Sequence, residues 1–167
     1  MDKLHTISVF TENSPGVLHR ITVIFTRRKV NIESLTVSET ERKGVSRFTI
    51  VVRSEEEIIN KILQQIARIV EVLDVSARPN QDLLFKEIAF YRVAANNLEK
   101  RGQIEDISRR YDSKVVHLSE NSLVIEKTGN EDEVNSLYLL LEPYGIREFV
   151  RSGRIAITKD FNAPQIE

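Results

Sequence analysis

The residues best suited to bind a small molecule lie in the segment TENSPGVLHRI, residues 11–21. A strand that ends here and runs directly into a helix leaves several backbone N–H groups unpaired. Such groups attract a carboxylate or a phosphate without help from a cationic side chain. Gly16 has no Cβ and lets a ligand approach the backbone, the amide of Asn13 can both donate and accept, and Val17 and Leu18 could line a small apolar pocket. The segment fits a free α-amino acid with an aliphatic side chain, and a plain capped turn is the alternative.

The side chains that usually perform catalysis are not grouped in this sequence. The three histidines, His5, His19 and His117, fall in different expected elements and have no HxH or HExxH spacing. The acidic runs SEEE and NEDE come at expected helix starts, where carboxylates satisfy free N–H groups and meet the positive end of the helix dipole. The chain has no Cys, and it contains no GxGxxG, Walker A or GxSxG motif. We therefore expect no catalytic residue, no metal site and no bound cofactor, in a protein that is not an enzyme by itself.

Composition and charge exclude several other classes of protein. Of the 167 residues, 41% are apolar, which is enough to form a core. Lys and Arg number 24 against 25 Asp and Glu, so the chain lacks the basic excess typical of sequence-independent nucleic-acid binders. The densest basic run, FTRRK at residues 25–29, is explained by the negative end of a helix dipole. No apolar run approaches the ~20 residues of a membrane span, and the N-terminus does not have the pattern of a signal peptide, so we expect a cytoplasmic protein.

The hydrophobic periodicity of the first half predicts the order strand, helix, strand, strand, helix, strand. In sequence these are a strand over residues 4–11, a helix with the apolar face Val17, Leu18, Ile21, Ile24 and Phe25, strands over residues 31–39 and 46–53, a helix with the apolar face Ile58, Ile59, Ile62, Leu63 and Ile66, and a strand over residues 70–78. Ser14 is expected to cap the first helix, with Pro15 at its first position. Ser54 and Glu57 have the spacing of a capping box in front of the second helix.

The second half repeats this order after the short polar segment PNQDLLF. The expected elements are strands over residues 87–95, 114–118 and 123–127, a helix over residues 97–110, a capped helix that starts at Asn130 and Glu133 and stops at Pro143 and Gly145, and a final strand region over residues 145–159 with a break at Ser152 and Gly153. The fold class is therefore α+β, with two successive ferredoxin-like βαββαβ units, each a four-stranded antiparallel sheet with both helices on one face. The domains are expected at residues 1–79 and 86–167, joined by a linker over residues 80–85.

Apolar residues at Leu35, Val37 and Val51 suggest that both faces of the first sheet are apolar. A sheet face or edge left uncovered in so small a chain is most simply covered by a second copy of the same chain. The sequence therefore predicts a homodimer.

The first turn and the strand after the first helix carry a resemblance to a known family. A βαββαβ unit with ENSPGVL between its first strand and helix, and VNIESLTV at its second strand, resembles an ACT domain, which senses amino acids. The longer run SVFTENSPGVLHRITVIFTRRKVNIESLTV is similar to the regulatory small subunits of acetolactate synthase, also called acetohydroxyacid synthase. The segments SRFTIVV, KEIAFYRV and RSGRIAITK extend this resemblance over essentially the whole chain, most strongly over residues 4–78.

This resemblance implies a non-catalytic subunit in the biosynthesis of valine, isoleucine and leucine. Such a subunit binds the large, thiamine-diphosphate-dependent catalytic subunit and raises its activity. It also confers allosteric feedback inhibition by a branched-chain amino acid, usually valine. The thiamine diphosphate, magnesium and FAD of the enzyme belong to the large subunit, so we expect none of them on this chain. The second half would be a C-terminal ferredoxin-like regulatory domain.

By the same resemblance, the effector-binding site lies between the ACT domains of two small subunits. The matching positions are Asn13, Gly16, Val17 and Leu18 on one chain and Asn31 and Ile32 on the other. The backbone N–H groups of residues 16–18 would hold the carboxylate of the effector, the two asparagines its ammonium group, and Ile32 its side chain. Pro15 departs from the family pattern, because many members carry there a residue with an N–H, so only the amides on either side of it contribute.

Two other functions are compatible with these observations. One is a stand-alone ACT-type small-molecule sensor that regulates another enzyme, and the other is part of an amino-acid-responsive transcription factor. The second requires a helix-turn-helix segment, and no helices are left outside the two expected units.

Overall fold

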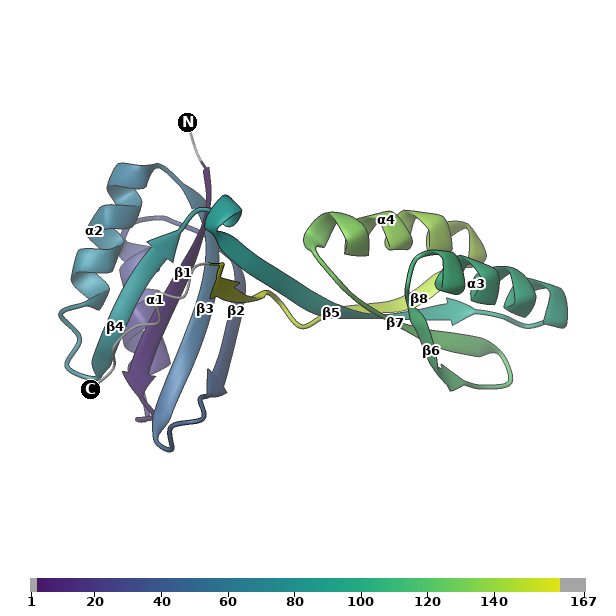
Figure 1. The fold of residues 1–167 in the computed structure, drawn as a ribbon, viewed down its shortest axis with the longest axis horizontal. Coiled ribbons are helices and arrows are strands. Elements are labelled where there is room, and N and C mark those ends of the chain that lie inside the picture. The colour runs from purple at the N-terminus through teal and green to yellow at the C-terminus, as the bar shows by residue number, and fades with distance from the viewer. Residues whose placement is uncertain (1–2, 160–167) are drawn as a thin grey trace. The chain divides into compact units, whose positions relative to one another are not determined.

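The computed structural model describes residues 3–159 of the chain. These residues form two compact units. Unit 2 consists of residues 86–153, and unit 1 consists of the residues described on either side of them, 3–85 and 154–159 (Figure 1). Each unit has the expected order of elements, with an antiparallel sheet and two helices, so the α+β class with two successive ferredoxin-like units is confirmed.

The elements follow the expected order with small changes at their ends. Unit 1 contains β1 (Lys3–Glu12), α1 (Val17–Arg27), β2 (Ile32–Glu39), β3 (Val45–Ser54), α2 (Glu56–Ile66), β4 (Val72–Arg78), a short 3₁₀ helix η1 (Asn80–Asp82), the start of β5 (Leu83–Ala94) and β9 (Ile155–Thr158). Unit 2 contains the rest of β5, α3 (Leu98–Arg110), β6 (Lys114–Leu118), β7 (Ser122–Gly129), α4 (Glu131–Leu141), a 3₁₀ helix η2 (Glu142–Tyr144) and β8 (Ile146–Arg151). The strand order is β2-β3-β1-β4 in unit 1 and β6-β7-β5-β8 in unit 2, and β9 pairs with β5. Within residues 3–159, no helix is long and apolar enough to cross a membrane.

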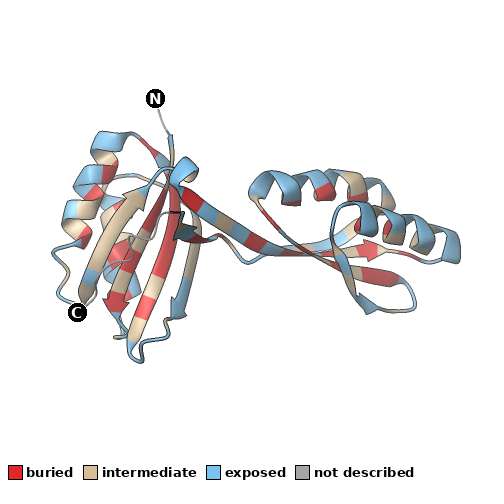
Figure 2. Cartoon of the chain, in the orientation of Figure 1, coloured by how far each residue is buried: buried red, intermediate tan, exposed pale blue. Residues whose placement is uncertain are grey.

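The core of unit 1 lies between one face of its sheet and the two helices. In the antiparallel pair of β1 and β3, Ile7 stands opposite Ile50 and Val9 opposite Phe48, and all four side chains belong to the core. The helices contribute the buried residues Val17, Ile21 and Phe25 of α1 and Ile59, Ile62 and Ile66 of α2 (Figure 2). Their spacing follows the helical period, which is why both expected apolar faces are present. Leu18, expected on the α1 face, is instead 43% exposed.

The core of unit 2 is built in the same way around β5. Ala89, Tyr91 and Val93 alternate along this strand, are fully buried, and pack with residues of β7, α3 and α4. The hydroxyl of Tyr91 donates a hydrogen bond to the backbone oxygen of Val134 at 2.8 Å, so this buried polar atom has its partner. Burial raises the pKa of the Tyr91 phenol well above its usual range, because the charged form would lose its solvation.

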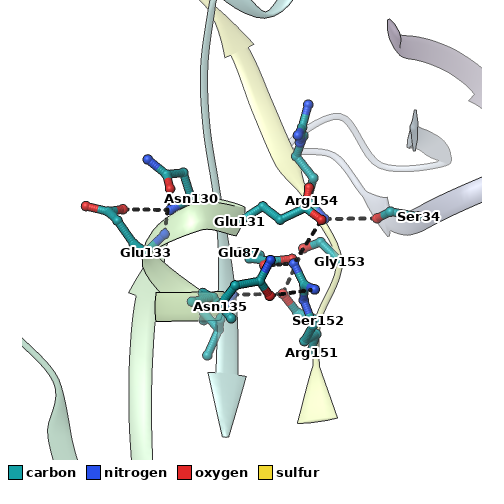
Figure 3. Close-up of polar contacts among 12 residues, drawn as sticks. Ser34, Glu87, Asn130, Glu131, Glu133, Asn135, Arg151, Ser152, Gly153 and Arg154 are labelled. Atoms are coloured by element: carbon teal, nitrogen blue, oxygen red, sulfur yellow. Dashed lines mark hydrogen bonds and ion pairs between the residues drawn. The ribbon is translucent and has the colours of Figure 1, made fainter. Parts of the chain in front are cut away.

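The helix starts differ from the expectation in unit 1 and agree with it in unit 2. Ser14 does not cap α1, because the helix begins after Gly16, whose φ of 85° is left-handed and which has no side chain to act as a cap. Ser54 is the buried last residue of β3, and α2 begins without a side-chain cap. In α4 the expected capping box is present (Figure 3): the Asn130 side chain accepts from the Glu133 N–H at 2.9 Å, and the Glu133 carboxylate accepts from the Asn130 N–H at 2.7 Å.

The unit boundaries differ from those expected for the linker and for the C-terminal residues. Residues 80–85, expected as a linker, are η1 and the first three residues of β5. Residues 154–159, expected in the second domain, belong to unit 1, where Arg154 contacts Thr6 and Asn80 and the Lys159 N–H donates to the Asp82 oxygen at 2.9 Å. The expected break at Ser152 and Gly153 is present between β8 and β9. Residues 160–167 of the expected second domain lie outside the described part of the chain.

Residues 154–159, which we call the C-terminal strap, bind to the outer face of the unit 1 sheet, the face opposite the helices. The hydroxyl of Thr36 donates to the backbone oxygen of Arg154 at 2.9 Å. The Arg154 N–H in turn donates to the Ser34 hydroxyl at 3.1 Å (Figure 3). Further along the strap, the Arg47 guanidinium donates to the backbone oxygen of Ala156. The strap is therefore held to both β2 and β3.

The side chain of Arg154 fixes the start of the strap. It is 6% exposed, and its guanidinium donates to the Thr6 hydroxyl and to the Asn80 side-chain oxygen, both at 2.9 Å. The same guanidinium lies 3.9 Å from the centroid of the Phe85 ring, which is the geometry of a cation–π contact. A buried charge is costly unless polar groups surround it, and these contacts supply them.

The expected apolar residues do lie on both faces of this sheet, with Val51 on the outer face and Leu35 and Val37 on the helix face. These two residues stand opposite Ile50 and Phe48 of the core, so both lie on the helix side. Of the three residues considered, Val51 points to the outer face, where it is 3% exposed. The strap covers much of this face. The part of the sheet that a second copy would cover is therefore its edge.

Candidate functional site

The turn between β1 and α1, residues 13–16, is anchored at its start. The N–H of Asn13 donates to the Gly44 oxygen at 2.8 Å, and the N–H of Ser14 donates to the Glu12 oxygen at 2.9 Å. Gly16 then takes its left-handed conformation, and a Cβ added there would meet nothing within 4 Å. The glycine is therefore required by its backbone conformation, and the space beside it is open to a ligand.

Several backbone donors at this turn are free. The N–H groups of Gly16, Leu18 and His19 donate to no atom among the described residues, and Pro15 has no N–H to offer. Free N–H groups at a helix start carry the positive end of the dipole, and the first turn of α1 contains no acidic residue. The turn can therefore hold a carboxylate through two or three backbone hydrogen bonds.

The side chains around these donors supply one polar and one apolar group. Asn13 is exposed beside the turn, and Leu18 is half-exposed on the first turn of the helix. Val17, expected to line the same pocket, is 2% exposed and packs into the core of unit 1. Its side chain therefore packs the start of α1 against the core, and Leu18 provides the apolar contact at the surface.

The other two expected site residues, Asn31 and Ile32, lie at the opposite end of the same sheet. Along β3, Glu12 stands opposite Val45, whereas Ile32 stands opposite Val52. Seven residues of extended strand separate these positions, which is about 24 Å. Asn31 is exposed, and Ile32 is half-buried at the margin of the core. One chain alone does not bring the six residues together.

The three histidines, His5, His19 and His117, lie in three different elements, β1, α1 and β6. The Nε2 atom of His5 lies 3.2 Å from the backbone oxygen of Ser54, while His19 and His117 are exposed. In the described range 3–159, no three His, Cys, Asp or Glu residues gather closely enough to hold a metal ion.

Sequence reasoning missed the residues that hold the strap. Ser34 and Thr36 lie on β2, two and four positions after Ile32, and contact Arg154 across separations of 120 and 118 residues. The available signal was an arginine followed by the alternating segment IAIT. Nothing local in that pattern says which sheet it joins, because the partner strands are far away in sequence.

A second polar cluster, in unit 2, was also missed. The carboxylate of Glu87, 8% exposed, pairs with the Arg151 guanidinium (Figure 3). The Arg151 side chain also lies 3.9 Å from a carboxylate oxygen of Glu131 and 3.5 Å from the Asn135 side-chain oxygen. Ser152 accepts from the Ile88 N–H at 3.0 Å. Each of these charges has a partner, so the cluster stabilises β5 against β8 and α4.

Known proteins resemble this chain over nearly its whole length. Residues 7–74 match the family profile described as the AHAS small subunit-like ACT domain, and residues 86–160 match that of the small subunit of acetolactate synthase. The chain is 39% identical over 155 residues to the probable acetolactate synthase small subunit of Archaeoglobus fulgidus, covering 93% of this chain and 96% of that one. It is also 39% identical over 155 residues to the acetolactate synthase small subunit of Mycolicibacterium smegmatis, covering 93% and 91%. The crystal structure of the acetolactate synthase small subunit from Thermotoga maritima matches with a TM-score of 0.87 at 29% identity, covering 95% of this chain and 98% of that chain.

Proposed function

Because this chain belongs to the family of acetolactate synthase small subunits, we propose that it binds the catalytic subunit of acetolactate synthase, raises its activity, and makes that activity sensitive to a branched-chain amino acid, with valine as the effector. The observation that carries the effector site is the set of free N–H groups at Gly16, Leu18 and His19. They suit the carboxylate of an amino acid, with Asn13 beside them for the ammonium group and Leu18 for the aliphatic side chain.

The edge of the unit 1 sheet offers a way to complete this site. β2 is an edge strand that pairs with β3 alone among the described strands. If the β2 strands of two copies pair antiparallel around a two-fold axis, the first residue of one β2 meets the last residue of the other. That last residue, Glu39, lies at the same end of its sheet as Glu12 and the β1–α1 turn. Asn31 and Ile32 of one copy would then lie about three strand spacings, or ~14 Å, from the end of β1 that carries the turn of the other.

Such a site couples the effector to the arrangement of the two subunits. An amino acid held by both copies favours the arrangement in which both halves of the site are in place, and it can inhibit only through that preference. A coupling free energy of about 1–3 kcal/mol is typical and corresponds to a several-fold to roughly hundred-fold change in activity or affinity. Asn13 and Asn31 are the side chains whose loss should reduce this preference most.

The proposal is tested by measuring acetolactate formation by the cognate catalytic subunit with and without this chain, across a valine titration. We expect stimulation by the chain and its reversal by valine. Asn13→Ala should keep the stimulation and raise the valine concentration for half-maximal inhibition about tenfold or more. The matched control is Asn96→Ala, which removes an exposed asparagine from the corresponding β5–α3 turn of unit 2 and should change neither property.

Three results would contradict separate parts of this proposal. A chain that does not stimulate the catalytic subunit contradicts the regulatory role. Stimulation that no branched-chain amino acid reverses contradicts the effector. A normal valine response in both Asn13→Ala and Asn31→Ala contradicts the assigned site.

A further inference from the structure

The outer surface of the helix layer in unit 1 contains a groove with an unusual concentration of arginines. This groove, which we call the arginine groove, has a volume of about 720 Å³ and runs between α1 and the end of α2. Its lining consists of His19, Arg20, Val23, Ile24, Arg27 and Arg28 from α1 and the residue after it, and Gln65, Arg68 and Ile69 from the end of α2 and the residues that follow. The aliphatic side chains are half-buried at its floor, and most of the cationic ones are exposed at its rim.

The positive charge of the arginine groove is mostly unpaired. Arg20 forms an ion pair with Glu71. The side chains of Arg27, Arg28 and Arg68 have no carboxylate partner among residues 3–159. The chain as a whole is balanced, with 24 basic and 25 acidic residues, yet no Asp or Glu occurs between Glu12 and Glu33. The groove therefore carries a local excess of positive charge in a chain whose total charge is close to zero.

The helix dipole explains only part of this pattern. Arg27 and Arg28 lie at the C-terminal end of α1, where cations are favoured. Arg68 follows the C-terminal end of α2, where a cation is also favoured, but Arg20 lies in the first turn of α1, where the dipole disfavours it. The dipoles therefore do not explain why arginines from both ends of α1 and from the end of α2 gather on one surface. Their shared property is that they surround the same aliphatic floor.

The side chains of the arginine groove indicate what kind of molecule binds there. Guanidinium groups bind carboxylates with two parallel hydrogen bonds, and an aliphatic floor suits the apolar residues of a peptide. No Phe, Tyr or Trp lines the groove, so the rings on which nucleic-acid bases stack are not present in it. We infer that the arginine groove binds an acidic segment of a protein, and that this protein is the catalytic subunit, an inference that rests on the proposed function.

α1 gives this contact a route to the effector site. The helix carries the β1–α1 turn at its start and the arginine groove along its outer side, and it is fixed to the sheet by Val17, Ile21 and Phe25. If effector binding at the turn displaces α1, His19 and Arg20 in the groove move with it. Effector binding and the contact with the catalytic subunit would then be linked through one rigid element.

The test compares two charge reversals of equal size in the full-length chain. Arg27→Glu, Arg28→Glu and Arg68→Glu together reverse the arginine groove, and Arg109→Glu, Arg110→Glu and Arg147→Glu reverse three exposed arginines of unit 2. We expect the groove variant to raise the chain concentration needed for half-maximal activation about tenfold or more at low ionic strength, with normal activation at saturation. The unit 2 variant should change it less than about threefold. High salt screens the charges, so it should raise the wild-type concentration needed for half-maximal activation toward the value of the groove variant.

Folding and effector binding are measured on the same samples. Circular dichroism and calorimetric titration with valine on the isolated chain should give the same folded structure and the same effector affinity for wild type and both variants. If the triple reversal does not fold, Arg27→Gln, Arg28→Gln and Arg68→Gln replace it, with an expected rise of about threefold or more.

Each outcome has a separate meaning. If the wild type activates the catalytic subunit and the groove variant activates it at the same concentration, the inference is overturned and the proposed function stands. If the wild type does not activate at all, the proposed function fails and the inference fails with it. Loss of binding to a single-stranded oligonucleotide in the groove variant, with activation unchanged, would assign the groove to a polyanion and overturn the inference.

Discussion

The β1–α1 turn of unit 1 and the β5–α3 turn of unit 2 connect corresponding elements in opposite ways. In unit 2 the side chain of Asn97 accepts from the N–H of Lys100 at 2.8 Å, so the helix satisfies one of its own free donors. In unit 1 a left-handed Gly16 stands at the same place, no side chain caps the helix, and the N–H groups remain free. The same topology therefore gives a structural turn in one unit and a turn suited to an anion in the other.

The outer sheet faces of the two units differ as well. In unit 1 the C-terminal strap binds this face, and Thr6, Thr49 and Val51 are buried there. In unit 2, Phe90 and Val150 stand opposite each other on the face away from the helices, and they are 42% and 49% exposed. The repeated fold therefore does not determine how the outer face is covered: the strap covers it in unit 1, and Phe90 and Val150 stay half-exposed in unit 2.

The largest effect should come from removing core volume in one unit at a time. Ile50 in unit 1 and Ile125 in unit 2 are both fully buried in separate core clusters. Ile50→Ala and Ile125→Ala should each lower the free energy of unfolding by about 2–5 kcal/mol. Hydrogen exchange should place the loss in the mutated unit. Tyrosine fluorescence is a second reporter, because all four tyrosines lie in unit 2 and the chain has no Trp. Equal loss of protection in both units after either change would show that their stabilities are not separate.

The next largest effect tests the difference between the outer faces. Arg154→Met removes the hydrogen bonds of the buried guanidinium to Thr6 and Asn80, and it should destabilise unit 1 by about 1.5–3 kcal/mol. The exposed Arg147 of unit 2 provides the control, and Arg147→Met should stay within about 0.5 kcal/mol. Exchange rates of the β1 and β2 amides are the measurement. Unchanged protection of these strands in Arg154→Met would mean that the strap does not stabilise the sheet.

A smaller effect tests the difference between the helix starts. Asn130→Ala removes a capping box and should cost about 1 kcal/mol, within the 0.5–2 kcal/mol typical of such caps. Ser14→Ala should cost less than about 0.5 kcal/mol, because Ser14 does not cap α1. Thermal unfolding of both variants under one set of conditions measures this. If Ser14→Ala cost as much stability as Asn130→Ala, Ser14 would be a helix cap, in contradiction to the structure.

The smallest effect near neutral pH concerns Tyr91. Tyr91→Phe removes one buried hydrogen bond and should cost about 0.5–1.5 kcal/mol.

Because burial raises the pKa of Tyr91, the folded chain keeps the proton that the unfolded chain loses near pH ~10. The stabilisation is therefore fully present below about pH 10 and is lost as the pH rises toward the folded pKa. Urea unfolding followed from about pH 8 to pH 11 should show a smaller alkaline loss in Tyr91→Phe than in the wild type. Parallel pH profiles for the two proteins would contradict this assignment.

The secondary structure could be predicted well because its causes are local. The alternation along β1 and β5 and the helical stripes of α1 and α2 follow from which side chains share a face. Capping could be predicted only in part, since Ser54 and Glu57 have the same spacing as Asn130 and Glu133. β3 extends through Ser54 and buries it, so that spacing never becomes a cap. Tertiary structure therefore decides between two equivalent local patterns.

The free backbone donors of the β1–α1 turn could be predicted from the sequence, but the positions of the other candidate site residues in the fold could not. The free donors follow from a strand that ends just before a helix, so Asn13 and Gly16 could be identified from the sequence. The burial of Val17 and the position of Ile32 at the far end of the sheet depend on strand register. The contact of Arg154 with Thr6 spans 148 residues, and no local pattern encodes such a partner.

The strap also determines the order in which the chain can finish folding during its synthesis. The strands and helices of unit 1 leave the ribosome first, but the 68 residues of Lys86–Gly153 must be made before Arg154 can reach Thr6 and Ser34. At about 5–20 residues per second this takes about 3–14 s. During that interval the outer face around Val51 and Thr49 lacks the strap. The unit that begins to fold first is thus the last to be completed.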